Sequence, residues 1–133
     1  MNYFKINGRT FNVVVTAIEE NFTILYSENT GRTASLGAEM TLDPLGTFYG
    51  HVVTVKRKKG YDRDFDNLYN LVSRPVYDGW DVEIVHNQET ISYRAYISNG
   101  TRALKVIDEK NNTVHWDSLQ LNIVPKKAQV LPE

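Results

Sequence analysis

Short segments that alternate apolar with polar residues fill most of this sequence, and turn-forming dipeptides separate several of them. A period of two is typical of β-strands that bury one face. Asn7-Gly8 and Asn99-Gly100 favour the positive φ angles of tight hairpin turns, and Asp78-Gly79 predicts a further turn. The sequence therefore predicts a mainly β fold whose neighbouring strands run antiparallel.

We expect strands in both halves of the chain, over residues 3–6, 11–17, 22–26, 47–58, 80–86, 90–98, 102–107 and 113–124. The apolar residues change parity within the last segment, because Trp116 is even-numbered and Leu119 begins an odd-numbered series. Such a shift indicates a β-bulge near Asp117 and Ser118.

One segment, residues 62–74, has the pattern of a helix. Apolar residues recur at helical spacing between Phe65 and Val72, and the carboxylate of Asp62 or Asp64 can cap the first turn. Pro75 is incompatible with a continuing helix. The sequence therefore predicts a single helix at about 62–74.

Residues 27–46 lack a regular pattern. Glycine and proline interrupt the segment, and apolar side chains are scattered along it. These features predict a long loop, whose apolar residues argue against a solvated linker. We therefore expect the loop to be ordered by packing against another surface.

The order of these elements predicts one α+β domain over residues 1–133. Its simplest architecture is two packed antiparallel sheets, as a β-sandwich or a flattened barrel. The helix would cover one opening between the sheets.

The composition narrows the function classes. The 15 Lys and Arg residues nearly balance the 16 Asp and Glu residues, and the net charge of -1 argues against binding nucleic acid over the whole surface. The absence of cysteine excludes disulfides, a Cys-based zinc site and a thiol nucleophile. No apolar run approaches the roughly 20 residues that span a bilayer, and no signal peptide is evident. We expect a cytoplasmic location and no membrane partner.

Motifs for catalysis or cofactor binding are missing from the sequence. It has no G-x-S-x-G motif and no glycine motif for phosphate binding. His51, His86 and His115 do not have the spacing of a zinc site, although His51 and His86 would meet if strands 47–58 and 80–86 paired. We therefore expect no catalytic, metal or cofactor site, no small-molecule substrate and no enzymatic activity.

A basic run at the end of the longest predicted strand consists of Lys56, Arg57, Lys58 and Lys59. Phe48, Tyr49 and Tyr61 lie nearby in the sequence, and positive charge beside aromatic faces is typical of oligonucleotide-binding barrels. The alternative is a solvated strand end, where lysines protect an exposed edge from pairing. The sequence leaves both interpretations open.

Aromatic residues favour an assembly role. The eight tyrosines and two tryptophans exceed what the core of a small domain needs, and both types are enriched at protein interfaces. For any single residue, packing in an aromatic β core is the alternative. Together with the apolar residues of segment 27–46, they favour contact with other subunits.

The chain also carries a resemblance in residues 31–33 (Gly-Arg-Thr), 43–48 (Asp-Pro-Leu-Gly-Thr-Phe), 64–75, 82–96 and 116–132, the last of which includes Ala-Gln-Val-Leu-Pro at 128–132. These stretches resemble a family of small proteins encoded in the tail modules of siphophages and prophages of Gram-positive bacteria. The resemblance extends over residues 30–132.

The resemblance implies a structural virion protein of the tail tube, the tail tip or baseplate, or a tail-associated component. Many such proteins share a tail-tube fold with two packed sheets, a flanking helix and a long loop that reaches a neighbouring subunit. It also implies ring assembly in the bacterial host cytoplasm, usually by six subunits, and contact with other tail proteins. Phage DNA in a lumen would be touched only passively.

On this basis we expect an intersubunit contact at or near Arg32, Leu36, Met40, Leu42, Pro44, Leu45 and Phe48. Two alternatives stay open. One is a head–tail joining or completion protein. The other is a small oligonucleotide- or carbohydrate-binding β-barrel, in which residues 56–59 would contact nucleic acid.

Overall fold

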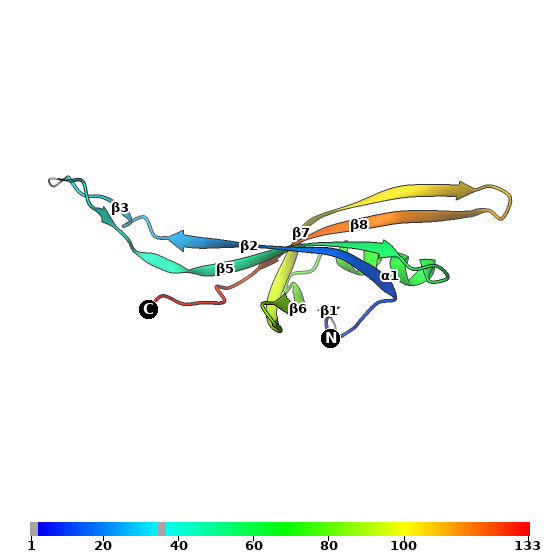
Figure 1. Ribbon diagram of the computed structural model, residues 1–133, viewed down its shortest axis with the longest axis horizontal. Helices are drawn as coiled ribbons and strands as arrows, with labels where there is room; N and C mark the ends of the chain where they lie inside the picture. The colour runs from blue at the N-terminus through cyan, green and yellow to red at the C-terminus, as the bar shows by residue number, and fades with distance from the viewer. Residues whose placement is uncertain (1–2, 35–36) are drawn as a thin grey trace.

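Two long β-hairpins set the shape of the protein in a computed structural model (Figure 1). β2 (Val13–Tyr26) pairs with β5 (Pro44–Arg57), and β7 (Glu89–Asp108) pairs with β8 (Thr113–Pro125). The far ends of the two hairpins extend in opposite directions from a central body.

The structure describes residues 3–34 and 37–133. Six strands form one antiparallel sheet in the order β1–β6–β7–β8–β5–β2. The elements besides the long hairpins are β1 (Phe4–Ile6), β6 (Trp80–His86), α1 (Asp62–Val72) and the paired short strands β3 (Gly31–Arg32) and β4 (Met40–Thr41). The mainly β fold with one helix is confirmed, and α1 lies within the predicted segment 62–74.

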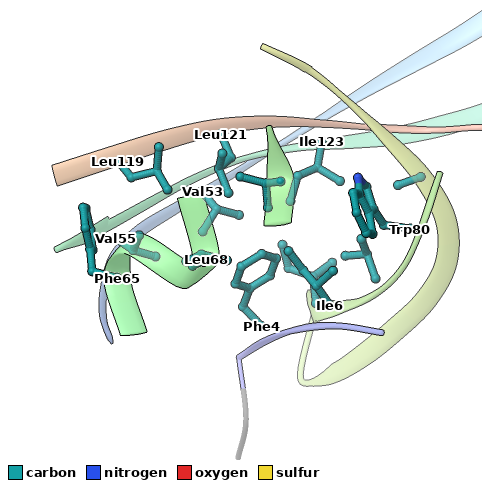
Figure 2. Packing of buried hydrophobic residues seen from close by; sticks show 14 residues of the cluster. Phe4, Ile6, Val53, Val55, Phe65, Leu68, Trp80, Leu119, Leu121 and Ile123 are labelled. Atoms are coloured by element: carbon teal, nitrogen blue, oxygen red, sulfur yellow. The ribbon is translucent and has the colours of Figure 1, made fainter. Parts of the chain in front are cut away.

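The hydrophobic core lies between the inner face of β5 and β8 and a layer formed by α1, β1 and β6 (Figure 2). β5 and β8 contribute alternate residues, as a strand with one buried face requires. The fully buried side chains include Val53, Val55, Leu119, Leu121 and Ile123 from these strands, and Ile6, Phe65, Leu68, Val82 and Ile84 from the facing layer.

The two packed layers are parts of one continuous sheet. The first half of β7 pairs with β6, and its second half runs beside β8. The register of β7 against β8 shifts between Ile97 and Asn99. A strand can bend at such a shift. β7 therefore carries the chain from one layer of the fold to the other.

Two of the predicted strand breaks are wrong. β2 continues through Asn21, which lies opposite Gly50; a Cβ at residue 50 would be 2.7 Å from the Asn21 side-chain oxygen. β7 continues through Asn99 and Gly100, because the Asn122 side chain donates a hydrogen bond of 2.6 Å to the Asn99 side-chain oxygen across the strands. Local turn preference yields to cross-strand contacts at both places.

Two other local predictions are confirmed. Asn7 and Gly8 have φ angles of 52° and 74° and join Ile6 to Arg9 in a tight turn. In the second hairpin Ala103 pairs with Ser118 and Leu104 with Trp116, so Asp117 has no opposite residue. The β-bulge therefore lies where the parity change predicts it.

The predicted helix cap is wrong. Tyr61 precedes α1 and makes no side-chain capping bond. Asp62 instead accepts a hydrogen bond of 3.2 Å from Arg57, and Asp64 accepts one of 2.8 Å from the Asn12 backbone N–H. Both carboxylates still lie in the first turn, where the helix dipole favours negative charge.

Candidate functional site

The segment predicted as a long loop is mostly the far end of the first hairpin. We call residues 21–34 and 37–50 the first arm. β3 pairs with β4 within it, and β5 already begins at Pro44, so the loop predicted over 27–46 is shorter than expected. Hydrogen bonds from the Ser27 side chain to the Asp43 carboxylate and from the Asp43 backbone N–H to Thr30 Oγ1 hold the two sides together.

The first arm extends the apolar face of the core beyond the part that other elements cover. Phe22 pairs with Tyr49 on the face that carries Val53 further along β5. Phe22 nevertheless has 67% of its surface exposed. The large apolar residues exposed on this arm are Phe22, Ile24, Leu25, Tyr26, Met40, Leu42 and Leu45. A surface of this kind on a protruding element is typical of a protein interface.

The structure brings most of the predicted contact residues onto this arm. Met40, Leu42 and Leu45 are exposed, as is Arg32, whose guanidinium donates to the Ala38 carbonyl oxygen at 3.4 Å. Pro44 and Phe48 are half-buried. Leu36 lies outside the described residues.

The β2 side of the arm was missing from the predicted contact set. The sequence predicts a strand over residues 22–26, but nothing in it shows that this part of β2 extends past the core. The available signal was the occurrence of apolar residues at both parities between Phe22 and Tyr26, which is unusual for a strand with one solvated face.

The C-terminal segment braces the first arm where it leaves the body. The Gln129 side chain accepts from the Tyr49 backbone N–H at 3.0 Å and donates to the Tyr49 carbonyl at 3.1 Å. The Thr47 N–H donates to the Val130 carbonyl at 2.9 Å. Residues 129–130 thus act as a short extra strand beside β5.

The second hairpin forms a second arm, which we define as residues 99–117. β6 ends before this part of β7, and β5 pairs with β8 only as far as Ser118, so residues 104–117 of the arm form a two-stranded ribbon. Its exposed large apolar residues are Leu104, Val106, Ile107 and Val114. The sequence does not predict this arm, because Asn99-Gly100 indicates a turn between two short strands.

A polar network closes the core at the base of the first arm. His51, 1% exposed, places Nε2 2.9 Å from Glu20 Oε2 and Nδ1 2.7 Å from the Tyr93 hydroxyl. His86 Nδ1 lies 2.7 Å from the same Glu20 oxygen. The strands that carry His51 and His86 do not pair, and the two residues are linked through Glu20 instead. With both histidines neutral, each donates one N–H to the carboxylate and Tyr93 donates to His51.

Burial and charge shift the acidity of this network. Burial lowers the pKa of His51 even though Glu20 favours its charged form. For Glu20, burial raises the pKa, but hydrogen bonds from His86 and His51 outweigh burial and leave it below the usual value. Burial also raises the pKa of Tyr93. The native network therefore favours neutral His51 beside ionised Glu20.

The basic run lies at the opposite end of β5, where the second arm leaves the body. Lys56, Arg57 and Lys59 line an open cavity of about 370 Å³ together with Gly60, Asp62, Lys105, His115 and Asp117. Lys58 lies beside this cavity with its ammonium group 5.4 Å from the ring centroid of Tyr61. The structure therefore joins the basic run to charged residues of β7 and β8 that are distant in sequence.

Within residues 3–34 and 37–133, no group of three or more His, Asp or Glu side chains has the arrangement of a metal site. None of the helices in the described part of the chain is long and apolar enough to cross a membrane. No protein-family model matches the chain, and none of the curated proteins compared with it is significantly similar.

Proposed function

We propose that this protein is a structural subunit of a phage or prophage tail, and that it works by self-assembly into rings. The tail assignment rests on the sequence resemblance over residues 30–132. The observation that carries the assembly mechanism is the first arm, on which Phe22, Leu42 and Leu45 are exposed and whose far end extends away from the central body (Figure 1).

The physical argument is the cost of leaving these side chains in water. Burying a large aliphatic or aromatic side chain stabilises a contact by about 1.5–3 kcal/mol. The first arm carries several such residues on a ribbon braced by Gln129, so little further ordering is needed when a partner covers it. A second copy of this chain is the simplest partner, because the second arm exposes Val106, Ile107 and Val114.

Two features of the sheet support ring formation. The outer edge of β2 pairs with no other strand of the described sheet, and it is 14 residues long. Opposite extension of the two arms allows one subunit to contact neighbours on both sides (Figure 1). Contacts of this head-to-tail kind close into rings when the rotation between subunits permits. We propose six subunits per ring, other tail proteins as further partners, and the virion tail as the final location.

Native mass spectrometry tests this proposal. A discrete oligomer, six subunits in the simplest case, supports ring assembly. The double variant Leu42→Ser/Leu45→Ser should shift the population to monomer while circular dichroism stays unchanged. A matched variant, Leu131→Ser, changes an exposed apolar residue outside both arms and should leave the oligomer intact. Oligomers that survive the arm variant would contradict the proposed mechanism.

A further inference from the structure

The cavity at the base of the second arm combines residues from three separate parts of the chain. Lys56 and Arg57 end β5, Lys59 lies in the following turn, and Lys105 and His115 come from β7 and β8. We propose that this cavity binds the phosphate backbone of nucleic acid. The inference does not depend on the proposed assembly, since it concerns binding by the free chain.

Protection of an exposed edge does not explain Lys56. Lysines that protect a strand from unwanted pairing belong on an edge. Lys56 lies between two strands, paired with Val14 of β2 on one side and Ser118 of β8 on the other. Its charge therefore has no role in blocking an exposed edge.

Two β-bulges supply residues to the cavity. The register passes from Leu104–Trp116 to Val106–His115, which leaves Lys105 without an opposite residue, and Asp117 is unpaired in the same way. Both unpaired residues line the cavity. Bulges redirect side chains and are frequent beside binding sites. The irregularities of the second arm thus place a further positive charge beside the basic run.

The turn after β5 contributes by geometry. Gly60 has a φ of 87°, and the Tyr61 N–H donates to the Lys58 carbonyl at 2.9 Å. This tight turn brings Lys59 back to the cavity that Lys56 lines. Tyr61 lies in the chain between the lining residues Gly60 and Asp62, and its ring is exposed, with the Lys58 ammonium group 5.4 Å from the ring centroid. An exposed aromatic ring is a surface on which a base can stack.

The charges in the cavity are only partly neutralised. Asp62 is occupied by Arg57 and His115, each at 3.2 Å, and Asp117 is 4.0 Å from Lys105. The ammonium groups of Lys56 and Lys59 form no ion pair or hydrogen bond with the residues that the structure describes. Two ammonium groups are therefore available to an anion.

Lysine charges next to an exposed aromatic ring favour a nucleic-acid phosphate over the carboxylate of a peptide. The planar arginine fork binds carboxylate and phosphate alike, and here Arg57 already binds Asp62. Lysine ammonium groups act as point charges and suit the oxygens of a phosphodiester. Tyr61 adds a stacking surface that an acidic peptide would not use.

Fluorescence anisotropy with a labelled DNA duplex and a labelled single strand tests this proposal. At about 50 mM salt, where phosphate contacts contribute most, the variant Lys56→Gln/Lys59→Gln should bind at least about tenfold more weakly. For the duplex, the slope of log affinity against log salt should also become shallower by about two, one unit per lost phosphate contact. Asp117→Asn removes a competing carboxylate and should tighten binding.

A matched double variant provides the control. Lys126→Gln/Lys127→Gln changes the net charge equally at a site on the other side of the body, and it should bind like the original chain. Circular dichroism establishes that each variant is folded. Binding of the duplex or of the single strand with this pattern supports the inference.

Three results would overturn it. The first is no binding of either nucleic acid at low salt. The second is an equal loss of binding in Lys56→Gln/Lys59→Gln and Lys126→Gln/Lys127→Gln, which would show that only the net charge of the protein matters. The third is tighter binding of inorganic phosphate or polyglutamate than of DNA, which would assign the cavity to a small anion or to an acidic peptide.

Discussion

Arg102 connects the helix to the second arm. Its guanidinium carbon lies 3.8 Å from the ring centroid of Tyr69 on α1 and 3.9 Å from that of Trp116 on β8. Arg102 Nη1 also donates to Asp66 Oδ1 at 2.9 Å. Contact with two rings together with an ion pair makes this side chain a structural link between α1 and the second arm, although its buried Nε has no hydrogen-bond partner among the described residues.

We expect Arg102→Ala to lower the free energy of unfolding by about 2 kcal/mol, because both stacking contacts and the ion pair are lost together. Arg102→Lys should recover less than half of the free energy of unfolding that Arg102→Ala loses, since an ammonium group is not planar and cannot stack on a ring as a guanidinium does. Chemical denaturation measures the difference, with exposed Arg63→Ala as the control. An unchanged midpoint for Arg102→Ala would contradict the role assigned to this residue.

The His51 network predicts a pH-dependent stability. The pKa of His51 is lower in the folded than in the unfolded chain, so the unfolded chain binds more protons as the pH falls below about 6.5. The pKa of Glu20 is also lowered, and its contribution is lost as the pH falls below about 4.5. Both groups make the protein less stable in acid.

Thermal unfolding between neutral pH and about pH 3 measures this effect. The melting temperature should begin to fall near the pKa of unfolded histidine, and His51→Gln should flatten that first part of the curve. Glu20→Gln should flatten the part below the pKa of an unperturbed glutamate. A variant that keeps the full acid dependence would show that other groups cause it.

At the scale of the elements, the C-terminal segment determines how firmly the first arm is held. Gln129→Ala removes both side-chain hydrogen bonds to the Tyr49 backbone, at a cost of about 1–2 kcal/mol. Amide exchange of Thr47, whose N–H donates to Val130, should become faster in this variant. Exchange within buried β8 should stay slow. Unchanged protection of Thr47 would mean that the arm does not depend on the brace.

The C-terminal segment also lies close to Gly46, so a side chain at this position should weaken the same brace. A Cβ at residue 46 would be 2.5 Å from the Cβ of Ala128 and 3.0 Å from the Val130 carbonyl oxygen. Gly46→Ala should therefore displace the C-terminal segment and also accelerate exchange at Thr47. The matched change Gly31→Ala meets no atom within 4 Å and should leave exchange there unaltered.

Sequence patterns predicted the elements well where one short-range rule decides the outcome. The Asn7-Gly8 turn, the bulge at Asp117 and the helix from Asp62 each depend on neighbouring residues alone. The continuity of β2 and β7 was not predictable in this way. It depends on Gly50 and Asn122, which lie on other strands and become neighbours only after folding.

At the scale of the whole molecule, the candidate surfaces follow from how far each hairpin extends past the core. Sequence reasoning placed Met40, Leu42 and Leu45 in the expected contact because they lie in a segment without a regular pattern. It left out Phe22 because nothing in the sequence shows that this part of β2 extends past the core, and it left out the second arm because Asn99-Gly100 predicts a turn inside β7. It singled out residues 56–59 but not Lys105 and His115, which the pairing of β8 with both β5 and β7 brings to the same place.

The central claim is that the first arm drives self-association, and sedimentation velocity tests it most directly. Association follows mass action, so we expect the original chain to shift from small species to larger oligomers between about 1 and 100 µM. Leu42→Ser/Leu45→Ser should sediment as a monomer throughout that range, while Leu131→Ser behaves like the original chain. Equal association of the arm variant and the original chain would contradict the claim.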